Sequence, residues 1–284
     1  MVALRGLQIH LTRWGPAATR ERPPVFLLHG YMDTSDTFQF LVDAFENDWP
    51  LIAPDWRGFG RSAWPVDGYW FPDYVADLDA LLDRFTPDAP ARLLGHSMGG
   101  NVAGLYSGAR PERVRCLVSL EGFGLPRMHI DQAPLRMRLW LEQLTSAPEF
   151  GSYESFAQLG AVIRKRHPRI SESRALFIAN SWGGLAEDGR VRLKGDPRHR
   201  LVNPVLYRRD EAECFWRRLT APALMLFGAQ SEIAHRLGPE GSEETFKALI
   251  PQLRTATIED AGHMLHLERP EAIAPLIERF LHTN

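Results

Sequence analysis

Residues 92–100, RLLGHSMGG, join a short apolar run to a glycine-rich stretch, NVAGLYSGAR, that resembles a helix. Within this segment residues 95–99 match the pattern G-x-S-x-G. A sharp turn from a strand into a helix exposes a serine hydroxyl to a nearby base, and the N–H groups at the helix start favour a developing oxyanion. The segment therefore predicts a strand–turn–helix unit with Ser97 as a nucleophile.

Other apolar runs of strand length are spread along the chain, namely VFLL (25–28), LIAP (51–54), VRCLVSL (114–120) and ALMLFG (223–228). Continuous apolar runs are typical of strands that are buried on both faces of a parallel sheet. Helical patterns over residues 72–85 and 270–281 alternate with these runs, and residues 6–14 read as an edge hairpin. This alternation predicts an α/β fold with a mostly parallel sheet.

The alternation is interrupted between residues 125 and 219, where helical patterns occur without a buried strand run. We therefore expect an α/β core made of residues 1–124 and 220–284, with residues 125–219 inserted as a helical cap. The insertion holds 17 Lys/Arg and 11 Asp/Glu, a charge of 17 − 11 = +6, against a net charge of −2 for the whole chain. It is either a solvated helical surface or a mildly positive lid that favours anionic substrates.

Composition excludes several classes of protein. The chain has 284 residues, long enough for a large core without disulfides, and its 33 Lys/Arg against 35 Asp/Glu leave no basic footprint for nucleic acid. The N-terminus does not read as a signal peptide, and no apolar run approaches the length of a membrane span. Cys116 and Cys214 lack the spacing of a metal or redox motif. We expect a cytoplasmic protein.

Two further segments are candidates for completing a site around Ser97. An oxyanion hole needs two backbone donors, and we expect these to be the N–H groups of Tyr31, in the loop after the 25–28 run, and of Met98. The general base is predicted to be His263, in the loop before the last helix, in preference to His266. His29 and His96 are interpreted as structural.

Four motifs occur in an order that resembles one known family: HGYMD (29–33), DWRGFGRS (55–62), GHSMGG (95–100) and DAGHMLHLERPE (260–271). They resemble the α/β-hydrolase superfamily, and in particular its capped branch of esterases, dehalogenases, epoxide hydrolases and C–C hydrolases. The resemblance implies an eight-stranded, mostly parallel sheet with helices on both faces and a helical cap. It covers the chain apart from the cap.

The acid of the expected Ser–acid–His triad is left open between two residues. Much of the family has an Asp about three residues beyond the Gly that ends the seventh strand, but this sequence has Ser231 there, and a serine carries no charge. Glu232 is one residue out of register. Glu121 directly follows the 114–120 run, where a subset of haloalkane dehalogenases has its acid, and it is the preferred candidate.

The serine at the turn indicates the reaction class. Dehalogenase and epoxide hydrolase relatives have an aspartate there. Ser97 instead favours acyl transfer, in which the acyl group of a small ester-like substrate passes to the serine and then to water, without a cofactor or a metal. Alternatives are C–C bond hydrolysis or perhydrolase chemistry on the same triad, and a ligand-binding signalling protein. Trp70, Phe123 and Trp182 are candidates for an aromatic substrate pocket, with core packing as the alternative.

Overall fold

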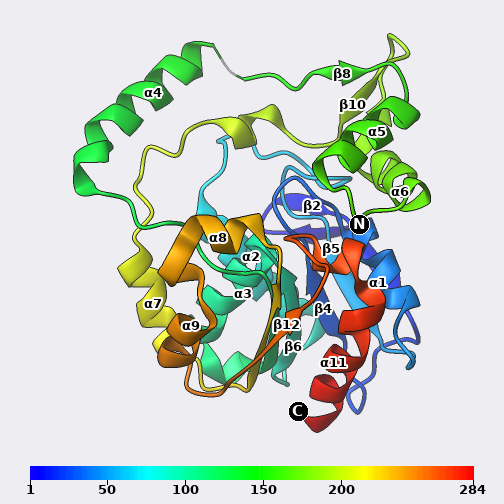
Figure 1. Cartoon of the computed structure of the whole chain (residues 1–284), viewed down its shortest axis with the longest axis vertical. Coiled ribbons are helices and arrows are strands. Elements are labelled where there is room, and N and C mark those ends of the chain that lie inside the picture. The colour runs from blue at the N-terminus through cyan, green and yellow to red at the C-terminus, as the bar shows by residue number, and fades with distance from the viewer. Residues whose placement is uncertain (147) are drawn as a thin grey trace.

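Seven strands form the central sheet of the computed structural model, which describes residues 1–146 and 148–284 (Figure 1). In spatial order they are β12 (Leu253–Ile258), β11 (Ala223–Gly228), β7 (Val114–Leu120), β6 (Ala91–His96), β4 (Val25–Leu28), β5 (Leu51–Pro54) and β3 (Leu11–Trp14). All neighbouring strands pair in parallel except β3, which is antiparallel to β5 at the edge. The predicted α/β fold with a mostly parallel sheet is confirmed.

The number of strands is a correction to the expected eight. Strands β1 (Val2–Leu4) and β2 (Leu7–Ile9) pair only with each other in a separate two-stranded sheet, among the residues described. The predicted edge hairpin over residues 6–14 is wrong in its pairing for the same reason. Its first half belongs to the β1–β2 hairpin, whereas β3 bonds to β5.

The two faces of the sheet are buried in different clusters, because successive side chains of a strand point to opposite sides. In β4, Val25 and Leu27 belong to one cluster, and Phe26 and Leu28 belong to the other. Strands β6 and β11 alternate in the same way, and β7 does so from Cys116 onward, beyond a shift in its register with β6. The runs are apolar throughout because both of their faces are covered.

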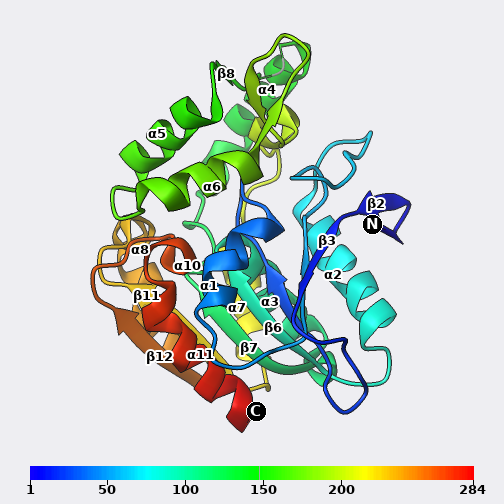
Figure 2. The same ribbon diagram turned by 90° about the vertical axis from the view of Figure 1, so that its right-hand side faces the viewer.

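Helices cover the two faces, as Figure 2 shows. One face is packed by α1 (Gln39–Asp43) and α11 (Pro270–Thr283), with α10 (Leu265–Glu268) beside them. The other carries α2 (Phe71–Phe85), α3 (Met98–Ala109), α7 (Arg209–Arg217) and α9 (Glu243–Leu249). Within the described ranges no helix is long and apolar enough to cross a membrane.

The segment between β7 and β11 holds α4 (Ala133–Thr145), α5 (Phe156–Arg166) and α6 (Glu172–Trp182), together with a small sheet of β8 (Ser152–Tyr153), β10 (Val191–Leu193) and β9 (Gly183–Leu185). In both views α4, α5 and α6 lie at the end of the molecule opposite the C-terminus. Helices α5 and α6 share a cluster of their own with Met264 and Leu267. Helix α7, by contrast, packs on α3 through Trp216 in the core of the sheet.

Candidate active site

Ser97 lies at the turn between β6 and α3 with a positive backbone φ of 50°. Such a φ is unfavourable for a residue that has a Cβ, so the surrounding contacts must hold it. Its N–H donates to Leu120 O of the neighbouring strand at 2.8 Å, and its carbonyl accepts from Asn101 N at 2.9 Å. The strand–turn–helix context predicted for Ser97 is therefore present.

Two glycines let this turn lie tightly against the sheet. A Cβ on Gly99 would be 2.0 Å from Leu28 O, and one on Gly95 would be 2.5 Å from Gly99 O. Atoms that are not bonded cannot approach so closely, so a side chain at either position would displace the turn. Steric exclusion of a side chain therefore explains why both fixed positions of the G-x-S-x-G pattern are glycines here.

His263 brings its imidazole to Ser97 from a position 166 residues away in the chain. It lies in the loop between β12 and α10, and its Nε2 is 2.9 Å from Ser97 Oγ. The side chain is 22% exposed, so it remains open to solvent on one side. The hydrogen bond lets the imidazole accept the hydroxyl proton.

The other ring nitrogen of His263 faces Glu121. Nδ1 is 3.1 Å from Glu121 Oε2, and the glutamate side chain is fully buried at the end of β7. The Glu121 backbone also has a positive φ, of 58°, and its Oε1 accepts a hydrogen bond from Gly228 N at 2.7 Å. A continuous chain of hydrogen bonds therefore joins Glu121, His263 and Ser97.

The two residues considered at the end of β11 have different surroundings. Glu232 is exposed in the first turn of α8 (Glu232–Leu237). Ser231 is buried, and its hydroxyl donates a hydrogen bond to Glu121 Oε2. The sequence shows no carboxylate at position 231, and the structure places the Glu121 carboxylate against that position instead.

The two expected oxyanion donors belong to loops that follow adjacent strands. Leu28 of β4 pairs with Gly95 of β6, so the segments beyond these residues run side by side. A Cβ on Gly30 would come within 3.3 Å of Ser97 Cβ, which places the Tyr31 loop against the serine. Met98 is the first residue of α3, and the first N–H groups of a helix have no partner within it.

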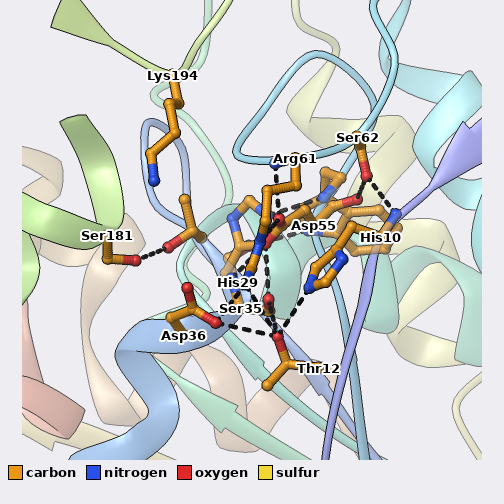
Figure 3. Close-up of polar contacts among 12 residues, drawn as sticks. His10, Thr12, His29, Ser35, Asp36, Asp55, Arg61, Ser62, Ser181 and Lys194 are labelled. Carbon is orange, nitrogen blue, oxygen red and sulfur yellow. Dashed lines mark hydrogen bonds and ion pairs between the residues drawn. The ribbon is translucent and has the colours of Figure 1, made fainter. Parts of the chain in front are cut away.

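The loop after β4 is fixed by a buried polar network, shown from one side in Figure 3. Asp55 accepts hydrogen bonds from Ser35 N and Ser35 Oγ, both at 2.7 Å, and from Arg61 N at 2.9 Å. His29 donates from Nδ1 to Gly30 O, and its Nε2 accepts from Trp56 N. Burial lowers the pKa of His29, which keeps the ring neutral in this role.

A second cluster, of Asp33, His96 and His266, contacts His263 through His96 and is not predicted above, because the three residues lie far apart in the sequence. One ligand atom from each residue lies within 4.8 Å of the others, so the three residues could hold a metal ion. His266 Nε2 is 3.4 Å from Asp33 Oδ2, and His96 Nε2 donates to His263 O at 2.8 Å. Burial and the adjacent histidines hold the pKa of His96 well below its ordinary value.

The three residues proposed for a substrate pocket occupy three different environments. Trp70 is 60% exposed just before α2, whereas Phe123 is buried with its ring centroid 5.5 Å from that of Phe227. Trp182 donates from Nε1 to Asp33 Oδ1 at 2.7 Å. A pocket lined by Trp70, Phe123 and Trp182 stays a prediction.

The inserted segment is joined to the loops after β4 and β5 by an aromatic stack and a hydrogen bond. His199, in a short 3₁₀ turn (Pro197–Arg200), lies on Phe59 with ring centroids 3.9 Å apart and an angle of 6°. The Tyr69 ring is 3.5 Å away, and Tyr31 Oη donates to His199 O at 3.0 Å. Burial lowers the pKa of His199 to about 4, so the ring is neutral near pH 7.

The free energy of unfolding is expected to fall as pH drops from about 6.5 to 4, partly through His199. Its pKa is lower in the folded than in the unfolded chain, so only the unfolded chain binds the proton in this range. The loss is at most about 3 kcal/mol. In His199→Phe, which keeps a ring in the stack, urea titrations at pH 7 and 4.5 should show a smaller fall than in the wild type. His129→Phe, at an exposed position, is the control. Equal falls in the free energy of unfolding of His199→Phe and of the wild type would contradict this prediction.

Comparisons with known proteins agree with the fold. A family model described as alpha/beta hydrolase fold matches residues 23–270. The chain is 28% identical to the serine hydrolase-like protein of Danio rerio over 94% of this chain and 83% of that protein. It is also 28% identical to esterase YbfF of Escherichia coli, over 91% and 92% respectively. The thioesterase domain from the curacin biosynthetic pathway superposes with a TM-score of 0.82 at 25% identity, over 98% and 97%.

The fold and these relatives define a class of hydrolase that is built on a mostly parallel sheet. The chain belongs to the alpha/beta hydrolase family, whose model spans most of its length. Relatives named serine hydrolase, esterase and lipase support hydrolase activity for the chain.

Proposed function

We propose that the chain is a serine hydrolase that cleaves a carboxylic ester, or a similar acyl bond, through an acyl-enzyme on Ser97. The observation that carries the proposal is the line from Glu121 Oε2 through the His263 ring to Ser97 Oγ, with contacts of 3.1 and 2.9 Å. A serine hydroxyl is a weak nucleophile unless a base removes its proton, and a third group must orient that base.

In the first half of the reaction, Ser97 Oγ attacks the carbonyl carbon while His263 Nε2 takes the hydroxyl proton. The Glu121 carboxylate holds Nδ1–H and stabilises the charged ring. The N–H groups of Tyr31 and Met98 bind the oxyanion, helped by the N-terminal end of the 12-residue helix α3. His263 then protonates the leaving oxygen, and the bond to the alcohol breaks.

In the second half, a water molecule attacks the acyl-enzyme. His263 takes one proton from the water, the carbonyl carbon gains its hydroxyl, and the proton is returned to Ser97 Oγ as the carboxylic acid leaves. The serine is regenerated, so the chain's own residues suffice for the cycle. The 22% exposure of the His263 side chain is consistent with access for that water.

We also propose that the inserted segment, expected at residues 125–219, forms the cap over the site, except for its last helix, α7, which packs on α3 in the core. Two contacts hold this segment to the loop after β4, since Ser181 bonds to Thr34 and Trp182 bonds to Asp33. Met264, next to His263, packs into the cluster formed by α5 and α6. A cap in this position would select the substrate, and its positive charge would favour an acyl group that carries an anionic substituent.

Hydrolysis of short p-nitrophenyl esters tests the proposal. We expect saturable turnover of the acetate or butyrate ester. The kcat/KM for these esters should exceed the kcat/KM for a diketone that would be cleaved at a carbon–carbon bond. A higher kcat/KM for the diketone would favour C–C hydrolysis on the same residues. Tight binding of a ligand with turnover far below one per minute would instead favour a signalling protein, and either outcome would contradict the ester assignment.

A further inference from the structure

The turn between β11 and α8 binds both oxygens of the Glu121 carboxylate. Gly228 N donates to Oε1 at 2.7 Å, and the Ser231 hydroxyl donates to Oε2, the oxygen that also faces His263 Nδ1. Glu121 and Ser231 are both about 1% exposed, so water does not compete for these contacts. A carboxylate held at both oxygens cannot rotate away from the imidazole.

The Ser231 hydroxyl directs its proton at the Glu121 carboxylate because its oxygen already accepts a hydrogen bond from another group. Ser231 is the N-cap of α8, and its Oγ accepts a hydrogen bond from Ala234 N at 3.2 Å. Its own N–H donates to Gly228 O at 3.0 Å, which closes the turn that carries both donors to Glu121. The hydroxyl proton is not used by the helix cap, and it forms the hydrogen bond that the Glu121 carboxylate accepts.

We propose that Ser231 is a positioning residue for Glu121, and that a carboxylate at position 231 can take over the orientation of His263. The inference rests on the proposed function. Strands β7 and β11 are neighbours, with Leu120 opposite Leu226, so residues 121 and 231 follow them at the same edge of the sheet. Ser231 Oγ and His263 Nδ1 contact the same oxygen, so a carboxylate at 231 can occupy the place of Oε2 once Glu121 is shortened.

The first experiment separates the hydroxyl from the helix cap. Ser231→Gly removes the hydroxyl while a glycine still serves as an N-cap, Ser231→Ala removes both, and Ser231→Thr keeps both. We expect kcat for a p-nitrophenyl ester to fall about tenfold in the Gly and Ala variants with KM unchanged, and to be restored in the Thr variant. A residue that only caps α8 would lower the melting temperature of the Ala variant and leave kcat unchanged.

The second experiment uses two double variants that differ in one charge. Asp and Asn are equally good N-caps of nearly equal size, so Glu121→Ala/Ser231→Asp and Glu121→Ala/Ser231→Asn should fold alike. We expect kcat of the Asp variant to exceed that of the Asn variant by at least about tenfold, because only the carboxylate stabilises the imidazolium. Circular dichroism and the melting temperature check that both are folded.

Two results overturn the inference: a kcat for Ser231→Gly within twofold of the wild type, or equal kcat values for the two double variants. Ser97→Ala distinguishes these from a failure of the proposed function. If wild-type hydrolysis does not depend on Ser97, the proposed function itself fails. If hydrolysis depends on Ser97 but not on the side chain at 231, only the inference about Ser231 fails.

Discussion

Replacing Ser97 with Ala is expected to lower kcat for a p-nitrophenyl ester by about 10⁵- to 10⁶-fold. The substitution removes the Oγ that lies 2.9 Å from His263 Nε2 and leaves a methyl group that cannot form the acyl-enzyme. The remaining rate would come from the oxyanion donors and substrate binding alone. Steady-state kinetics with enough enzyme to detect the residual rate provide the measurement.

Ser107 offers a matched control for this substitution. It lies on the same helix, is buried, and donates its hydroxyl to Ala103 O at 2.7 Å, away from the imidazole. Ser107→Ala should therefore change stability more than kcat. If Ser97→Ala retained more than a tenth of the wild-type activity, the hydrolysis would not depend on this serine.

Replacing Glu121 with Gln is the second large effect, with kcat expected to fall by about 10⁴-fold. The amide has nearly the same shape as the carboxylate, but it has no charge to stabilise the imidazolium. It also allows the ring to adopt the tautomer in which Nε2 carries the proton and cannot accept one from Ser97. KM should change little, because the Glu121 side chain is fully buried and contacts the histidine on the ring nitrogen that faces away from Ser97.

Glu232→Gln is the matched control, since this glutamate is exposed on α8. We expect its kcat to stay within about twofold of the wild type, as for most surface substitutions. A large loss in Glu232→Gln together with a small loss in Glu121→Gln would assign the acid to Glu232. The pair of variants therefore decides between the two carboxylates that the sequence left open.

Local patterns predicted the elements well. Apolar runs placed the inner strands, and the composition around residues 95–99 placed the turn before α3. The edge of the sheet was less predictable, because a pattern of alternating residues does not say which partner a strand bonds to. Residues 6–14 alternate as expected of a hairpin, yet β3 pairs with β5 about 40 residues further along the chain.

Long-range side-chain contacts were harder to predict than elements. The contact between His263 and Glu121 spans 142 residues and that between Ser231 and Glu121 spans 110. Only the order of the strands in the sheet brings these positions together. The same holds for Asp33 and His266, whose pairing follows from the packing of α10 beside the loop after β4. Two signals pointed to Glu121: an acidic residue at the end of an apolar run, and the resemblance to the haloalkane dehalogenases that have their acid there.

Labelling with a fluorophosphonate tests most directly whether Ser97 is an activated nucleophile. Intact mass spectrometry should show one phosphonyl group per wild-type chain, and peptide mapping should place it on Ser97. Labelling should be abolished in Ser97→Ala and slowed by orders of magnitude in His263→Ala. A wild-type chain that hydrolyses esters but stays unmodified, or that carries the adduct on another residue, would contradict the account.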